Sequence, residues 1–187
     1  MANRNTQGFG LIAAGTLGQT PATSGQGKYK IDAGYGTTIY QNGAVASSAG
    51  YIIDGQTTDA PILGVLNGIF YNAATTLKPT FANFYKQPIT PANSEDIDAF
   101  VFDNPQQQYV VAIDAALAQS GYLETYDMNA SAGSDTTGRS TSTLDHDDTS
   151  ADAASFRLLR SAEDPENDEN AAFRSVVVCI NLIELQS

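Results

Sequence analysis

Arg174-Ser-Val-Val-Val-Cys-Ile-Asn-Leu-Ile-Glu-Leu185 decides the fold, because it holds the longest cluster of β-branched and aliphatic residues in the chain. In a strand, Val176, Val178 and Ile180 point to one face. Val177 points to the other face, so the first half of the stretch is apolar on both sides. This pattern is typical of a strand that is covered on both faces. We therefore predict that the chain ends in a buried core strand.

Composition limits the class of protein. A chain of 187 residues suggests one domain, which on folding buries about 70% of the surface of its unfolded chain. Its apolar fraction of 42% excludes a fully disordered chain, while 16 Gly and 7 Pro predict many turns between short strands. We expect a mainly β fold: a small β-barrel or β-sandwich body with one short helix and an extended N-terminal arm.

Charge and hydropathy exclude two classes of partner. Nine Lys plus Arg against 21 Asp plus Glu give a formal net charge of −12, so phosphate backbones and anionic lipids repel the chain. The apolar run at residues 174–185 is far shorter than the roughly 20 residues that cross a bilayer. We expect neither nucleic acid nor a membrane as a partner.

Two smaller features concern the cellular compartment. The single cysteine, Cys179, lies inside the terminal stretch and is predicted to be a small core residue. Residues 1–7 lack the apolar run of a signal peptide, which predicts synthesis in the cytoplasm.

The N-terminal part differs in amino-acid composition from the rest of the chain. Residues 1–27 are rich in Asn, Thr, Gln and Gly, with one apolar island that contains Phe9, Leu11 and Ile12. Such a segment buries little surface alone, so it is either disordered or an arm that lies on something else. The island favours an arm. We predict an arm over residues 1–27, a β-rich domain over residues 28–187, and a body that folds without residues 2–14.

Short apolar runs bounded by turn residues fill the domain. The expected strands are residues 28–31, 37–40, 44–45, 51–53, 62–71, 98–103, 108–113 and 156–159. Asn42-Gly43 and Asp54-Gly55 supply the positive φ of tight hairpin turns. The two glycines of residues 62–71 predict a bend, a bulge or a close backbone approach.

Two local structures are expected in the middle of the chain. A hairpin around Asn104-Pro105 would join the strands at residues 98–103 and 108–113. A helix of two turns is predicted at residues 114–120, with Asp114 as N-cap and Gly121 just past its end.

Residues 75–93 contain three prolines together with Phe81, Phe84 and Tyr85. This composition predicts a long ordered loop whose aromatic side chains pack on the body or on a partner. Tyr29, Tyr35, Tyr40 and Tyr51 fit an interface patch and half-buried strand positions equally well.

Acidic clusters offer candidate cation sites. Asp145 and Asp147 flank the only histidine, His146, and fit either a Ca²⁺ or Mg²⁺ site or a solvated acidic loop. Asp164, Glu166 and Asp168 have the alternate spacing of the first EF-hand ligands, but the glycine and the twelfth-position glutamate of that loop are missing. We favour solvated loops in both places and expect no cofactor and no metal.

Catalytic motifs are missing from the sequence. Any serine hydrolase would depend on His146, and the chain has no Gly-Xaa-Ser-Xaa-Gly elbow and no phosphate-binding P-loop. Carboxylate pairs are too numerous to identify a glycosidase. Arg139, in a Gly-flanked turn, fits an ion pair to a neighbouring protomer or another protein, or an internal salt bridge or backbone cap that fixes the turn.

Several short motifs occur in order along the chain: Ala2-Asn3…Gly8-Phe-Gly-Leu11, Tyr40-Gln-Asn-Gly-Ala-Val45, Gly64-Val-Leu-Asn-Gly-Ile-Phe-Tyr71, Thr137-Gly-Arg-Ser-Thr-Ser-Thr-Leu-Asp145, Phe156-Arg-Leu-Leu159 and Ile180-Asn-Leu-Ile-Glu-Leu185. Together, and in this order, they resemble the capsid decoration (head cement) proteins of tailed bacteriophages. The resemblance implies a β-rich body without catalysis, commonly a homotrimer. It also implies that this body binds the outer surface of the virion shell.

We therefore expect a structural virion protein that binds the expanded capsid and cements neighbouring capsomers of the major capsid protein. The candidate capsid or protomer interface comprises Asn3, Arg4, Phe9, Leu11, Ile12, Phe81, Phe84, Tyr85 and Arg139. The alternative is a carbohydrate-binding or receptor-binding module on the virion surface, which would hold sugars with an acidic loop and exposed tyrosines.

Overall fold

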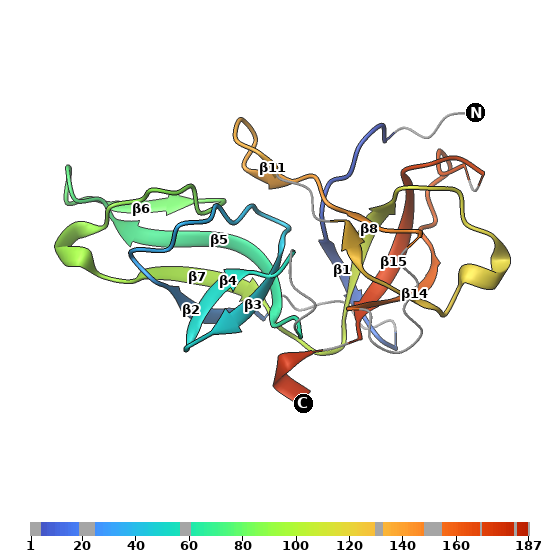
Figure 1. Ribbon diagram of the computed structural model, residues 1–187, viewed down its shortest axis with the longest axis horizontal. Coiled ribbons are helices and arrows are strands. Elements are labelled where there is room, and N and C mark those ends of the chain that lie inside the picture. Colours follow the sequence, from blue (N-terminus) through green and yellow to red (C-terminus); the bar gives the residue numbers. More distant parts are fainter. Residues whose placement is uncertain are drawn as a thin grey trace.

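Strands dominate the computed structural model, which describes residues 5–18, 25–56, 61–129, 133–147, 155–168, 170–181 and 183–186. Strands account for 47% of the structure and helices for 5%, so the expected mainly β fold is confirmed. Two sheets form two lobes that lie side by side along the long axis of the molecule (Figure 1). The strands of the first lobe lie between residues 27 and 102. The second lobe combines an N-terminal strand with strands between residues 107 and 180.

The first lobe has six strands in the order β2-β7-β5-β3-β4, with β6 paired to β5. They are β2 (Gly27–Ile31), β3 (Ala44–Ser48), β4 (Tyr51–Asp54), β5 (Gly64–Asn72), β6 (Pro79–Ala82) and β7 (Ile97–Phe102). All pairs are antiparallel, and β2 also contacts β4 at the far end of the order, so the sheet curls into a barrel-like shape. The register of β5 shifts between Leu66 and Gly68, so its pairing with β7 is irregular next to one of the two glycines, where the sequence predicted a bend, a bulge or a close approach.

The second lobe has seven strands in the order β10-β13-β8-β15-β14-β9, with β1 also paired to β8. They are β1 (Ile12–Thr16), β8 (Gln107–Ile113), β9 (Thr125–Tyr126), β10 (Met128–Asn129), β13 (Thr143–Leu144), β14 (Phe156–Ser161) and β15 (Arg174–Ile180). The two end strands of this order, β9 and β10, are separated in the chain only by Asp127, so this sheet also turns back on itself. A separate hairpin is formed by β11 (Gly133–Ser134) and β12 (Arg139–Ser140).

Strand β15 confirms the prediction made from the C-terminal stretch. All seven of its residues are buried, and it lies between β8 and β14 in the middle of the sheet. Val176, Val178 and Ile180 belong to the core of the second lobe, while Cys179, on the opposite face, is a free and buried thiol. Burial raises the pKa of this thiol, which disfavours the reactive thiolate.

The two lobes have separate cores that meet where they adjoin. The first core includes Ile39, Leu66, Tyr85 and Val101. The second is built mainly from β8, β14 and β15, but it also takes in Ala44, Ile62 and Val65 from the first half of the chain. Apolar packing therefore continues from one lobe into the other.

The expected hairpin around Asn104 is wrong, although both of its strands exist. β7 pairs with β2 and β5 in the first sheet, whereas β8 pairs with β15, β1 and β13 in the second. The Asn104 side chain accepts a hydrogen bond from the Gln106 amide at 2.9 Å, and its carbonyl accepts one from Gln107 at 2.9 Å. This turn leads the chain from one lobe to the other.

The expected helix at residues 114–120 is also wrong. Only a 3₁₀ turn forms there, η2 (Gln119–Gly121), and the other helical turns are η1 (Ala92–Ser94) and η3 (Glu184–Gln186). The Asp114 carboxylate accepts a hydrogen bond from the backbone amide of His146 at 3.0 Å, so it fixes a distant loop instead of capping a helix. Residues 37–40 form an isolated bridge through Ile39, not a strand. No helix among the described residues is long and apolar enough to cross a membrane.

The segment expected to be an N-terminal arm is extended but lies on the protein's own body. β1 pairs antiparallel with β8, and the amide of Leu11 donates to the carbonyl of Asn42 at 2.8 Å. Leu11 is fully buried in the second core, and a Cβ at Gly8 would overlap the backbone of Thr141. We therefore expect that deletion of residues 2–14 would destabilise the body, in contrast to the expectation from the sequence.

Two adjacent substitutions test this packing. Leu11→Ala removes a side chain with 0% exposure and should lower the free energy of unfolding by about 2–5 kcal/mol. Ile12→Ala, at a side chain that is 43% exposed, should change it by less than about 1 kcal/mol. Urea unfolding measures both. Equal effects would contradict the placement of the segment in the core.

Candidate functional site

The β11–β12 hairpin reaches from the second half of the chain onto the first lobe (Figure 1). The amide of Gln41 donates to the carbonyl of Gly138 at 2.9 Å, and the amide of Ser140 donates to the carbonyl of Gln41 at 2.8 Å. Gln41 and Arg139 are thus bridge partners. The hairpin and the residues it contacts form what we call the clasp: Thr38, Tyr40, Gln41, Asn83, Phe84, Lys86 and residues 133–140.

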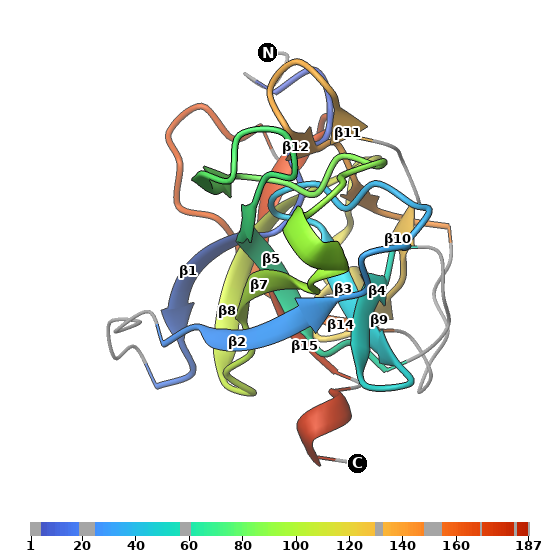
Figure 2. The same ribbon diagram turned by 90° about the vertical axis from the view of Figure 1, so that its left-hand side faces the viewer.

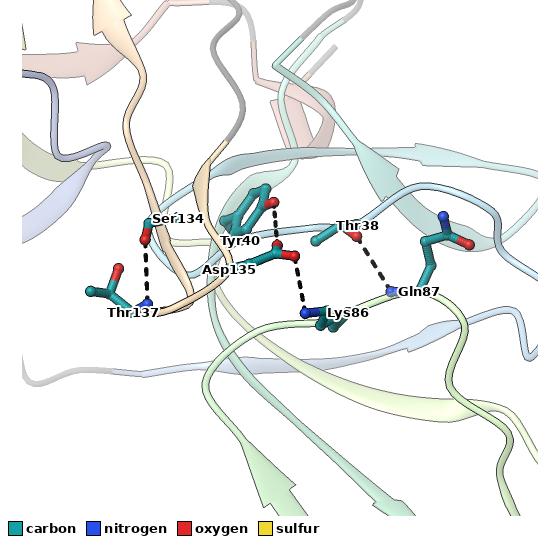
Figure 3. Close-up of polar contacts among 7 residues, drawn as sticks. All are labelled: Thr38, Tyr40, Lys86, Gln87, Ser134, Asp135 and Thr137. Carbon is teal, nitrogen blue, oxygen red and sulfur yellow. Dashed lines mark hydrogen bonds and ion pairs between the residues drawn. The ribbon is translucent and has the colours of Figure 1, made fainter.

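A carboxylate at the tip of the hairpin joins two side chains of the first lobe. Figure 3 shows Tyr40, Lys86 and Asp135 pointing toward one another. The Tyr40 hydroxyl donates to Asp135 Oδ1 at 2.7 Å, and Lys86 Nζ lies 3.0 Å from Asp135 Oδ2. The hydrogen bond from Tyr40, followed by that from Lys86, holds the pKa of Asp135 below its ordinary value. Burial, followed by the bond to Asp135, raises the pKa of Tyr40, so this phenol stays protonated at neutral pH.

Packing and backbone bonds shape the rest of the clasp. The Phe84 ring stacks on Tyr40 with centroids 5.7 Å apart and planes 5° from parallel. Asn83 donates to the carbonyl of Thr137 at 2.9 Å, and Gly138 has a φ of +69°. Beside it, the amide of Gln87 donates to the Thr38 hydroxyl at 3.4 Å (Figure 3). Of these contacts, the hydrogen bond from Asn83 to Thr137 joins the hairpin to the first lobe, whereas the Tyr40–Phe84 stack and the Gln87–Thr38 bond lie within the first lobe.

A buried polar network lies deeper in the same junction. The Ser140 hydroxyl donates to the Gln56 side-chain carbonyl at 2.8 Å, and Ser142 bonds to the same oxygen. Gln56 in turn donates to Asp54 at 3.2 Å, and burial raises the pKa of that carboxyl group. Partnered polar groups of this kind fix the relative position of the segments that carry them.

The predicted interface residues separate into buried and exposed groups. Leu11 and Tyr85 have 0% exposure inside the protein itself, so the interface assignment is corrected for them. Phe9 is half-buried, and Phe84 is held by the Tyr40 stack. The exposed members are Ile12, Phe81 and Arg139. Asn3 and Arg4 lie outside the described residues.

The clasp brings together only two of these residues, Phe84 and Arg139. Among the described residues Arg139 has no ion pair, and the turn is fixed by backbone bonds and Asp135 instead. Sequence reasoning missed Lys86 and Asp135, because no local pattern connects positions so far apart in the chain. The hydroxyls of Tyr29, Tyr35, Tyr40 and Tyr51 are all hydrogen-bonded, and their side chains are half-buried. Tyr29 and Tyr51 lie in strands as expected, whereas Tyr35 and Tyr40 lie in loops.

The carboxylates of the acidic loops accept hydrogen bonds from backbone amides two residues further along the chain. Asp145 accepts from the amide of Asp147, Asp164 from Glu166 and Asp168 from Asn170, each at 3.0 Å. His146 Nδ1 lies 3.2 Å from Asp147, and the histidine borders a cavity of about 340 Å³ beside Glu124 and Tyr126. In the part of the chain that the structure describes, no three His, Cys, Asp or Glu side chains are placed to hold a metal ion.

Substitution of a glycine tests the clasp. Gly138→Ala adds a Cβ that would overlap Phe84 and Asn83 at a positive φ, so we expect a loss of about 1–3 kcal/mol in unfolding free energy. Gly36→Ala is the matched control, because no atom lies within 4 Å of its added Cβ. Urea unfolding compares the two, and a neutral Gly138→Ala would contradict the close packing.

Asp135 should also make stability depend on pH. Its pKa is lower in the folded than in the unfolded chain, so its contribution is present above the ordinary value of 3.8 and is lost as pH falls below it. We expect the stability difference between wild type and Asp135→Asn to shrink as pH falls from neutral through 3.8. Thermal unfolding across this range measures it, and a constant difference would contradict the assignment.

Comparison with known proteins identifies no relative of this chain. No family model, no curated protein and no solved structure matches the chain. The resemblance to capsid decoration proteins therefore stays a prediction.

Proposed function

We propose that the protein is a non-enzymatic structural protein of a tailed-phage virion. It binds the outer surface of the expanded capsid and cements adjacent capsomers of the major capsid protein. The ordered sequence motifs support this proposal, and so does a β-rich body of two joined lobes, which suits a passive binding role. The observation that carries it is the exposed apolar edge of β1.

Strand β1 lies at the outside of the molecule (Figure 2). It pairs with β8 along one edge, and within the described residues no strand pairs with its other edge at residues 12–15. Ile12, the first residue of this strand, and Leu17, the residue after its end, are each 43% exposed. An unpaired edge that carries apolar side chains is a template for pairing with another chain.

This edge agrees with the part of the sequence that suggested a docking arm. Leu11 anchors the segment in the core, while its neighbour Ile12 faces outward. A docking strand that is already ordered loses less conformational entropy on binding than a free arm would. β1 would thus dock on the capsid as a strand of the folded body instead of as a free arm. The protein would bind as a homotrimer, as the resemblance implies.

Co-sedimentation with phage heads assembled without the protein tests the proposal. The heads come from the phage that encodes the chain, in expanded and unexpanded forms. We expect saturable binding to expanded heads only, at a fixed ratio to the major capsid protein. Ile12→Asp and Leu17→Asp should each weaken binding by about tenfold or more, because a charge would have to be buried.

Leu77→Asp is the matched control, because this leucine is 72% exposed on the first lobe, away from β1. It should bind as the wild type does. Failure of the wild-type protein to bind expanded heads would refute the proposal. Unchanged binding by folded Ile12→Asp and Leu17→Asp would refute the assignment of the β1 edge.

A further inference from the structure

A cavity of about 260 Å³ lies on the first lobe, away from both β1 and the clasp. It is lined by Lys30, Phe70, Tyr71, Asn72, Pro91, Glu95, Asp96 and Asp98. Ile31, Ile69, Ile97 and Ala99 belong to the first core. Their strand neighbours Lys30, Phe70 and Asp98 therefore point to the opposite, outer face of the sheet.

These side chains form a row across four adjacent strands. Lys30 of β2 is paired with Asp98 of β7, Asp98 with Phe70 of β5, and Phe70 with Phe81 of β6. Directly opposite residues have Cβ atoms about 4.5–5.5 Å apart, so the row is continuous. It runs from an ammonium group through a carboxylate to two aromatic rings, whose centroids are 4.7 Å apart.

Two ammonium groups share one carboxylate at the charged end of the row. Lys28 and Lys30 lie 2.8 Å and 2.6 Å from the Asp98 carboxylate, whose side chain is only 12% exposed. Burial raises the pKa of Asp98, but the hydrogen bonds from the two lysines outweigh it and hold this pKa below its ordinary value. The ion pair therefore persists at neutral pH.

Two further carboxylates border the cavity. Asp96 accepts a hydrogen bond from the Tyr51 hydroxyl at 3.3 Å, which leaves its other oxygen for a ligand, and Glu95 is exposed. Asn72 and Lys30 add donors to the same wall. The cavity thus offers an aromatic surface surrounded by both donors and acceptors.

This combination matches the chemistry of a neutral sugar. A pyranose has an apolar C–H face, which packs on an aromatic ring, and hydroxyl groups that each donate and accept hydrogen bonds. The volume is below the roughly 300–1,000 Å³ of pockets that enclose drug-sized ligands, so it holds one sugar residue of a longer chain. Glu95 and Asp96 repel acidic sugars.

We propose that this cavity binds a neutral hexose residue of a glycan, with Phe70 as the stacking surface and Asn72, Glu95 and Asp96 as hydrogen-bond partners. The site differs from the acidic loop and tyrosines that the sequence suggested. It goes beyond the proposed function and does not depend on it, because the β1 edge is on the other lobe.

Glycan-array binding by the purified full chain tests the proposal. The array carries neutral oligosaccharides of glucose, galactose, mannose and N-acetylglucosamine, with sialylated and sulfated glycans for contrast. We expect binding to at least one neutral series. Phe70→Leu keeps an apolar side chain but removes the ring, and Glu95→Gln removes an acceptor charge at an exposed position; each should weaken binding by about tenfold or more.

Glu124→Gln is the matched control, because Glu124 borders the cavity of the second lobe. It should leave glycan binding unchanged, and Glu95→Gln should leave capsid binding unchanged. If Phe70→Leu does not fold, Glu95→Gln still decides the result. The proposal is overturned if the folded wild type binds no neutral glycan at millimolar concentration, binds only acidic glycans or basic peptides, or if folded Glu95→Gln binds as tightly as wild type.

Discussion

Burial of β15 between β8 and β14 is the constraint on which the second lobe depends. Its partner β8 ends at Ile113, whereas β15 begins only at Arg174, so the sheet closes through contacts that are distant in the chain. Without β15, both neighbouring strands would present unpaired edges and the core would lose Val176, Val178 and Ile180. The segment Ile12–Thr16 joins the same sheet from the other end of the chain. Formation of the second lobe therefore requires both ends of the chain.

The strands could be predicted from local pattern, but their partners could not. The terminal stretch, the run near Phe156 and the two runs on either side of Asn104 all form strands close to the expected positions. Their alternation is the same whether two runs pair with each other or diverge into separate sheets, so the hairpin prediction failed. The helix prediction failed for a related reason. Asp114 is a suitable N-cap by sequence, but it bonds to a backbone amide 32 residues away.

The candidate sites were harder to predict, because each combines residues from distant segments. The clasp joins Tyr40, Lys86 and Asp135, and the outer row joins Lys30, Asp98, Phe70 and Phe81. Composition showed that acidic and aromatic residues are abundant, but only strand register shows which of them are neighbours. Leu11 and Ile12 illustrate the same limit within one segment. Both are apolar, and only the pairing of β1 with β8 determines which of them faces the core.

The contacts between the two lobes fix their relative orientation. The side chains of Lys86 and Asp135 are each about half exposed. Exposed ion pairs contribute little to stability, so this pair cannot hold the lobes together alone. The shared apolar packing of Ala44, Ile62 and Val65 and the buried network around Gln56 contribute more, because their separation would expose apolar surface and leave polar groups without partners. The two lobes should therefore move as one body. A ligand on the outer face of the first lobe would then keep a fixed orientation relative to any surface bound along β1.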